Sequence, residues 1–217
     1  MYNHAFPVTI VDNFLDDPFG VIELANKQKF YRDEEGKWPG LRTVNIAEVA
    51  PYFFERTIKK FFSMFYNDKE SYYNFVCGMY FQKVGSKYDD GWIHSDSGSI
   101  LSAIVYLNTN PAPNSGTSIY MPNTVDFNTS LHVEDKKESY KNGVDSPDKR
   151  KEINQQFHES IVVKNRFNRL IAFDGHIHHK ASFEQNKQKD DRLTLVFFIE
   201  KFVTSDDYPL FRLRQII

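Results

Sequence analysis

Two side chains near the middle of the chain, His94 and Asp96, have types and a spacing that could hold a metal ion. Segments rich in β-branched and aromatic residues flank them at 72–84 and 99–107. If residues 92–96 are themselves a strand, the two-residue period places both side chains on one face. A facing His and Asp are two of the three ligands of a 2-His-1-carboxylate site, which suits non-haem iron(II) and leaves coordination positions open. Alone, the pair is more typical of a strand end with a surface carboxylate.

A third ligand could come from a histidine-rich segment at 174–179, which contains His176, His178 and His179. A tract of this kind can be a metal site in its own right. In a strand, His176 and His178 would share one face and His179 would take the other. Only one of the two sets can point into a core, so two interpretations remain open. One is His179 with the His94 pair, and the other is a site of His94 with His176 and His178.

A basic and a hydroxyl side chain, Arg192 and Thr194, share one face of the predicted strand at 192–202. An arginine on a core-facing strand is costly unless an anion meets it. Its planar guanidinium binds a carboxylate through two parallel hydrogen bonds, and a threonine hydroxyl two residues on can donate another. The alternative is a half-buried arginine that pairs with Asp190 or Asp191.

The order of these motifs along the chain resembles the Fe(II)/2-oxoglutarate-dependent dioxygenases, and within them the prolyl-hydroxylase-like branch. His94-x-Asp96 is followed by Tyr106-Leu107-Asn108, Gly116, a distal histidine and Arg192-x-Thr194. The pair alone is a weak signal, but the ordered set is specific, and it covers roughly residues 80–202. The resemblance implies a mainly β fold with flanking helices, built on a double-stranded β-helix, a jelly-roll or cupin-like core.

The resemblance also assigns a role to each matching residue. His94 and Asp96 would be the first two iron ligands. His179 would be the third, because the distal histidine of such sequences follows a glycine, here Gly175, by four residues. Arg192 would bind the distal carboxylate of 2-oxoglutarate. Its hydrogen-bonding partners there would be Thr194 and Tyr106.

By this resemblance the chain is an oxygenase that uses Fe(II), 2-oxoglutarate and O2, hydroxylates a substrate, and releases succinate and CO2. The substrate, a small molecule or a peptide, is not identified, because a long polar segment separates Gly116 from the distal histidine and such insertions help to set substrate choice. A different class of function is a cupin-like module that binds a ligand or partner without turnover.

The remaining elements follow from hydrophobic periodicity. Residues 18–29 are expected to form a helix, and a second helix begins at Pro51 with a buried stripe that is more typical of core than of a groove. The stripe consists of Phe54, Ile58, Phe61, Phe62 and Phe65. The predicted strands are 8–11, 72–84, 100–108, 117–121, 160–163, 169–173, 176–182 and 192–202.

The expected organisation is a single oxygenase domain over residues 1–217. Residues 1–70 form a helical support layer and 72–202 a β core. Residues 123–156 form an insertion or lid loop with a short helix at 147–156. Before the β core, Trp38 and Arg42 flank a turn, where a packed Trp beside a solvated Arg is favoured over a substrate contact.

Composition limits the class of protein. Hydrophobic residues make up 41% and aromatic residues 16% of the 217 residues, enough for a packed core. A formal net charge of −2 argues against a nucleic-acid partner. The one cysteine, Cys77, fits a reducing compartment, and no secretory signal or long apolar run is visible, so we expect a cytoplasmic protein with no membrane partner.

Overall fold

The computed structural model describes residues 8–65, 73–85, 91–96, 98–124, 133–142, 147–182 and 191–204. Its helices are α1 (Pro18–Asn26), α2 (Ile46–Val49), α3 (Pro51–Phe62), α4 (Val133–Asn142) and α5 (Pro147–Asn154). Its strands are β1 (Thr9–Val11), β2 (Leu41–Arg42), β3 (Tyr73–Val84), β4 (Leu101–Tyr106), β5 (Gly116–Pro122), β6 (Phe157–Lys164), β7 (Leu170–Asp174), β8 (His178–Ser182) and β9 (Arg192–Thr204).

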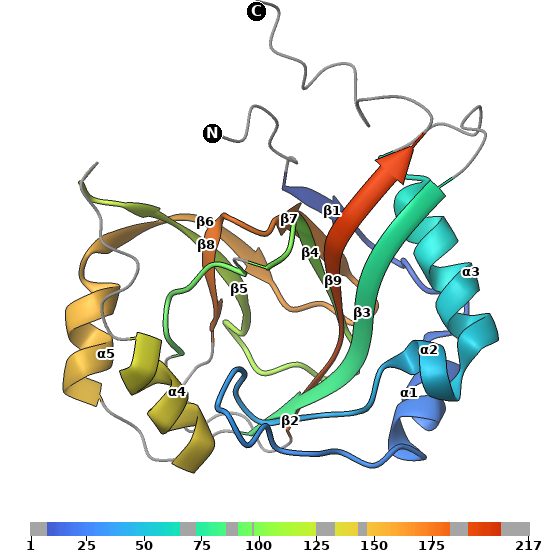
Figure 1. Ribbon diagram of the computed structural model, residues 1–217, viewed down its shortest axis with the longest axis horizontal. Coiled ribbons are helices and arrows are strands. Elements are labelled where there is room, and N and C mark those ends of the chain that lie inside the picture. The colour runs from blue at the N-terminus through green and yellow to red at the C-terminus, as the bar shows by residue number, and fades with distance from the viewer. Residues whose placement is uncertain are drawn as a thin grey trace, which may run out of the picture.

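The strands form two antiparallel sheets (Figure 1). The larger sheet has the order β1-β7-β4-β9-β3-β2, and the smaller has the order β6-β5-β8. Helices α1, α2 and α3 lie beside β3 and β9, whereas α4 and α5 lie at the opposite side of the molecule, next to the smaller sheet. This arrangement is a double-stranded β-helix with flanking helices, so the predicted fold class is confirmed.

Alternation along β4 and over residues 192–199 of β9 separates a helix-facing side from an inner side. The helix-facing residues of both strands belong to one hydrophobic core with the helical layer; they are Leu101, Ala103, Val105, Leu193, Leu195, Phe197 and Ile199. The residues between them in sequence face the smaller sheet. On that inner side Tyr106 of β4 lies opposite Thr194 of β9, so the polar side chains predicted to act together lie on one face.

Helix α3 is held by the apolar stripe expected from its periodicity. Pro51 starts the helix, where its missing N–H costs no hydrogen bond. Phe61 stacks on Phe197 of β9 at 5.3 Å between ring centroids and meets Phe65 edge-on at 5.4 Å. Truncation of a buried phenylalanine of this kind typically costs ~3–5 kcal/mol. The stripe is therefore part of the core that supports the larger sheet from behind.

Residues 92–96, considered from the sequence as a possible strand, form a loop. His94 makes a single antiparallel bridge with His179, and its neighbours take no strand pairing. His94 and Asp96 therefore do not share a strand face, and a loop held by one bridge positions both residues.

Other boundaries differ because short or polar elements carry little periodic signal. β2 and α2 were not predicted, and they have two and four residues respectively. α4 lies inside the predicted insertion, where its charged sequence suggested a loop. β8 begins at His178, so His176 is not part of a strand.

The division of the chain into a support layer, a β core and an insertion stays a prediction. Within the predicted insertion, residues 125–132 and 143–146 lie outside the described residues. None of the helices in the described part of the chain is both long and apolar enough to cross a membrane.

Candidate metal centre

His94, Asp96 and His179 converge at one point between the sheets. One potential ligand atom from each residue lies within 4.8 Å of the other two. Nε2 of His94 is 3.9 Å from one carboxylate oxygen of Asp96, and Nε2 of His179 is 3.6 Å from the other. Among the described residues this is the one group of three or more His, Cys, Asp or Glu side chains close enough to share a metal ion.

Backbone contacts join the loop to the smaller sheet and so place the three side chains. The amide of His94 donates to the carbonyl of His179 at 3.1 Å, and the return bond is 2.8 Å. The amide of Asp96 donates to the carbonyl of Gly175 at 2.7 Å. A Cβ at position 175 would lie 2.0 Å from the carbonyl oxygen of Ser99, a distance that only glycine permits. The Asp-Gly turn after β7 therefore fixes the position of Asp96.

The hydrogen bonds of the two imidazoles decide which ring nitrogen is available. Nδ1 of His94 is 2.8 Å from the carbonyl oxygen of Trp92, and Nδ1 of His179 is 2.9 Å from that of Ile177. A carbonyl oxygen only accepts, so each Nδ1 must donate its hydrogen. In the neutral rings Nε2 then carries the lone pair, as in metal-ligating histidines whose other nitrogen is held by an acceptor.

Electrostatics favour the protonation states that a cation requires. Burial, followed by the neighbouring His179, lowers the pKa of His94 to about 3, so this ring is neutral near pH 7. Burial by itself raises the pKa of Asp96, but His179, His94 and a 2.6 Å hydrogen bond from the Ser102 hydroxyl outweigh it and lower that pKa. A neutral imidazole and an ionised carboxylate are the forms that bind metals.

The other two histidines of the 174–179 segment lie elsewhere. His176 is exposed in the turn before β8, and its amide donates to the side chain of Asp174 at 2.9 Å. His178 is partly buried with its ring 4.8 Å from Phe157. The structure thus brings His179 to the pair, and it does not bring His176 or His178.

The residues predicted to anchor 2-oxoglutarate form a second buried group. Tyr106, Arg192 and Thr194 are each at most 5% exposed. The guanidinium carbon of Arg192 lies 5.3 Å from the centre of the Tyr106 ring, and the Tyr106 hydroxyl donates to Thr117 at 2.7 Å. The hydroxyl of Thr194 is buried and has no hydrogen-bond partner among the described residues. A buried hydroxyl in this state is rare and costs free energy unless a ligand satisfies it.

Burial is also the main influence on the charge of Arg192. It lowers the pKa of the guanidinium, and the neighbouring Tyr106 opposes this change. Of the two acids considered as partners from the sequence, Asp191 is exposed and Asp190 lies outside the described residues.

Two chambers meet at the three-residue cluster. The inner chamber, of about 90 Å³, is lined by His94, Asp96 and His179 together with Arg192. The outer chamber, of about 470 Å³, is lined by His94 and Asp96 and by residues from other parts of the chain. Those include Trp38, Tyr80, Lys136 of α4 and Glu200. The smaller chamber therefore combines the cluster with a buried guanidinium, and the larger chamber adjoins His94 and Asp96.

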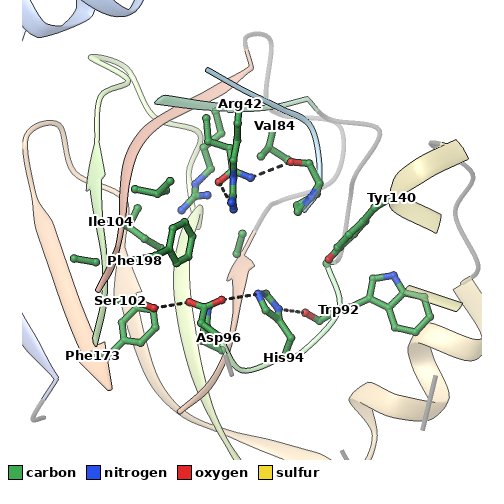
Figure 2. Close-up of a pocket in the computed structure, with 18 residues that line it drawn as sticks. Arg42, Val84, Trp92, His94, Asp96, Ser102, Ile104, Tyr140, Phe173 and Phe198 are labelled. Atoms are coloured by element: carbon green, nitrogen blue, oxygen red, sulfur yellow. Dashed lines mark hydrogen bonds and ion pairs between the residues drawn. The ribbon is translucent and has the colours of Figure 1, made fainter. Parts of the chain in front are cut away.

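Arg42 lines both chambers. The interpretation favoured from the sequence, a packed Trp beside a solvated Arg, is right about the packing, because the guanidinium carbon lies 4.7 Å from the centre of the Trp38 ring. It is wrong about solvation, because Nε of Arg42 is buried. Figure 2 shows Arg42 entering the pocket from the side opposite His94 and Asp96. Its strand, β2, pairs with β3 at only two positions, Leu41 with Lys83 and Arg42 with Gln82, which is too short for any periodic pattern.

Solved structures with the same fold belong to distant proteins. EvdO2 from Micromonospora carbonacea var. aurantiaca is 11% identical, with a TM-score of 0.55 over 96% of this chain and 92% of that chain. EvdO2 has also been solved in complex with 2-oxoglutarate, with a TM-score of 0.54 over the same shares. HygX from Streptomyces hygroscopicus, with nickel and 2-oxoglutarate bound, is 10% identical, with a TM-score of 0.53 over 96% and 89%. At these identities the likeness is one of fold.

Sequence comparison gives the family of the chain and nothing finer. No curated protein matches it significantly. Residues 1–199 match the family described as "Family of unknown function (DUF6445)". Since the match spans most of the chain, the protein belongs to the DUF6445 family.

Proposed function

We propose that this protein is a non-haem Fe(II)- and 2-oxoglutarate-dependent oxygenase that hydroxylates its substrate. One observation carries the proposal: the cluster of His94, Asp96 and His179 shares a chamber with the buried Arg192. A metal site alone would fit many activities. A metal site with a buried guanidinium in the same small chamber fits a chelating ligand that also bears a distal carboxylate.

The donor set fits iron(II). Two imidazole nitrogens and one carboxylate are the ligands of the facial triad, which leaves coordination positions for other molecules. Both Nδ1 atoms are engaged by backbone carbonyls, and Asp96 is oriented by Ser102. Such outer contacts fix the ligands before a metal arrives and are part of metal affinity.

The inner chamber fits 2-oxoglutarate. Arg192 offers a fork for the distal carboxylate, and the hydroxyl of Thr194, otherwise without a partner among described residues, can complete that contact. Tyr106 packs against the guanidinium and limits its movement. EvdO2 and HygX, which share the fold, were solved with 2-oxoglutarate.

When bound, iron(II) and 2-oxoglutarate supply the oxidation: 2-oxoglutarate, O2 and a C–H bond become succinate, CO2 and an alcohol. The residues of this chain hold and shield the reacting groups. Apolar side chains of the inner chamber, Ile104, Phe173 and Val196, exclude water beside the cluster. The substrate would enter from the outer chamber. We further propose that the protein belongs to the prolyl-hydroxylase-like branch of these oxygenases.

Anaerobic binding of Fe(II) and 2-oxoglutarate tests the proposed function. Anaerobic addition of Fe(II) and 2-oxoglutarate to the wild-type protein should produce a weak visible charge-transfer band, and Asp96→Ala should abolish it. Asp191→Ala, which changes an exposed acid, is the matched control and should keep the band. Failure of the wild-type protein to take up metal would refute the proposal. Uptake of both ligands without succinate release on any substrate panel would favour a non-catalytic binding module.

A further inference from the structure

Arg42 occupies the boundary between the two chambers. It lines both of them, as do His94 and Asp96. Its guanidinium carbon lies 4.7 Å from the ring centre of Trp38 and 4.8 Å from that of Phe198. Two aromatic rings therefore hold a planar cation in place at this boundary, and Figure 2 shows Arg42 projecting toward His94 and Asp96.

The hydrogen-bond donors of this group are incompletely satisfied. One terminal nitrogen of Arg42 donates to Gln82 at 3.2 Å, but Nε is buried and has no partner among the described residues. The indole N–H of Trp38 is also buried without a described acceptor. Both groups are donors only. Two neighbouring unsatisfied donors, one of them charged, call for an acceptor that carries negative charge.

The charges that face Arg42 do not supply that acceptor. Asp96 is the acid that acts on it most strongly, yet the two form no ion pair within 4.0 Å, and the metal centre would engage this carboxylate. Glu200, the other acid that lines the outer chamber, is exposed. Lys136 of α4 adds a second cation to the same chamber and forms no ion pair with a described residue. Burial lowers the pKa of Arg42 to about 10, so its guanidinium remains cationic near pH 7. Burial also lowers the pKa of Lys136.

We propose that Arg42, with the indole N–H of Trp38 and the ammonium of Lys136, binds an oxyanion of the substrate, a carboxylate or a phosphate. The inference rests on the proposed function, because it names the class of substrate that the outer chamber accepts. Arg192 holds the distal carboxylate of 2-oxoglutarate on the inner side, and Arg42 holds the substrate anion on the outer side. The two arginines then bracket the metal centre and set which carbon of the substrate approaches it.

A structural role for Arg42 predicts a different outcome. Stacking on Trp38 and Phe198 alone would make Arg42 a source of stability with no effect on ligand choice. Binding of 2-oxoglutarate by Arg42 would make its loss visible in co-substrate affinity. Ligand preference, co-substrate affinity and stability therefore have to be measured on the same variants.

The experiment uses the full chain loaded anaerobically with Fe(II) and saturating 2-oxoglutarate, so that Arg192 is already occupied. Benzoate, phenyl phosphate and benzamide share a phenyl ring and differ in charge, and each is titrated against the intrinsic fluorescence of the protein. We expect at least one of the two anions to bind roughly tenfold more tightly than benzamide. The anion that binds more tightly identifies the head group.

The variants locate that preference. Arg42→Gln should abolish it, Arg42→Lys should retain part of it, and Lys136→Gln should reduce it. Lys37→Gln is the control, because Lys37 also lines the outer chamber but pairs with Glu35 at 2.6 Å. This variant should prefer the anions over benzamide as strongly as the wild type does. The affinity for 2-oxoglutarate should stay within about twofold of wild type in Arg42→Gln.

Equal affinity for all three probes, or an anion preference that survives Arg42→Gln in a folded variant, would overturn the inference. So would a large loss of 2-oxoglutarate affinity in that variant. If Arg42→Gln does not fold, Lys136→Gln decides, since an unchanged preference there contradicts the shared site. Failure of the wild type to bind iron and 2-oxoglutarate would instead refute the proposed function. Titration of the metal-free protein with the same three probes would then still test whether Arg42 binds an anion.

Discussion

At the residue scale, the arrangement of His94, Asp96 and His179, the candidate metal centre, depends on contacts just outside it. Each imidazole is oriented by a backbone carbonyl, which no side-chain substitution removes. Asp96 differs, because a side chain, the hydroxyl of Ser102, holds one of its oxygens at 2.6 Å. Ser102 is therefore the residue through which the geometry of the cluster can be tested without loss of a ligand.

Ser102→Ala should lower the affinity for Fe(II) by roughly 10- to 100-fold, because the Asp96 carboxylate loses the bond that orients it and lowers its pKa. The dissociation constant for anaerobic metal binding is the measurement. Ser118→Ala, which removes a serine hydroxyl bonded at 2.6 Å to Ser182 on the smaller sheet, should leave it unchanged. Equal metal affinity in the Ser102 variant and wild type would contradict the role of this contact.

Arg192→Lys should weaken 2-oxoglutarate binding far more than iron binding, since an ammonium cannot reproduce the planar fork. Thr194→Val should produce a smaller loss of the same kind, on the order of tenfold, because it removes one hydroxyl from the buried anchor. Both constants are read from the same anaerobic titration. Parallel loss of iron and 2-oxoglutarate affinity would show that these residues support the fold rather than the co-substrate.

Alternation predicted that Arg192 and Thr194 share one strand face, and the structure places both on the inner side of β9. The choice of His179 and the role of Tyr106 came instead from the resemblance to a known family, because alternation alone left the third ligand open. Arg42 was assigned to solvent because a two-residue strand has no period, and its burial depends on Trp38 and on Phe198, which is distant in the sequence. Contacts between segments that are distant in the sequence produce no hydrophobic periodicity from which burial could be predicted.

At the element scale, the turn between β7 and β8 determines where the metal loop sits. Gly175 accepts the hydrogen bond from the amide of Asp96, and its missing Cβ lets Ser99 approach. Turn and loop therefore form one unit, although residues 96 and 175 are far apart in the sequence. This explains how a loop without strand pairing can hold two ligands.

Gly175→Ala should destabilise the protein by about 1–3 kcal/mol and weaken metal binding, because its Cβ would lie 2.0 Å from the carbonyl oxygen of Ser99. Urea denaturation and metal titration measure the two effects. Gly98→Ala is the matched control in the same region, since nothing lies within 4 Å of the position its Cβ would take. A Gly175 variant with wild-type stability and metal affinity would contradict the coupling of turn and loop.

Prediction of elements succeeded where apolar residues repeat and failed where they do not. The stripe of α3 and the faces of β4 and β9 follow from burial against one shared core. Helix α4 is charged along most of its length and is anchored by Tyr140, which joins a small cluster with Trp92, Tyr120 and Phe157. That cluster forms only in three dimensions, so the charged sequence suggested a loop.

At the scale of the whole molecule, the double-stranded β-helix places two adjoining chambers at one cluster, with His94 and Asp96 in the lining of both. Helices α1, α2 and α3 lie along the larger sheet (Figure 1). Helix α4 borders the outer chamber through Lys136 and Tyr140. Binding of iron and 2-oxoglutarate would join the loop, β8 and β9 through shared ligands. Ligands that bind only the folded state stabilise it by mass action.

Fe(II) and 2-oxoglutarate together should raise the unfolding temperature in the absence of oxygen. At about 100 times its dissociation constant a ligand adds ~2.7 kcal/mol, which corresponds to roughly 5–10 °C for a chain of this size. Differential scanning calorimetry measures the shift. In Arg192→Lys, 2-oxoglutarate should add little to the shift produced by iron alone. If 2-oxoglutarate raised the unfolding temperature equally in wild type and Arg192→Lys, it would bind at a site other than Arg192.

The central claim is that the cluster and the buried arginine together turn over 2-oxoglutarate with oxygen. The most direct measurement is the release of succinate and CO2 from 2-oxoglutarate by the iron-loaded protein. We expect the two products in equal amounts, an absolute need for O2, and loss of both products in Asp96→Ala and in Arg192→Ala. Wild-type protein that binds iron and 2-oxoglutarate, yet releases no more succinate with a broad substrate panel than Asp96→Ala does, would contradict the claim.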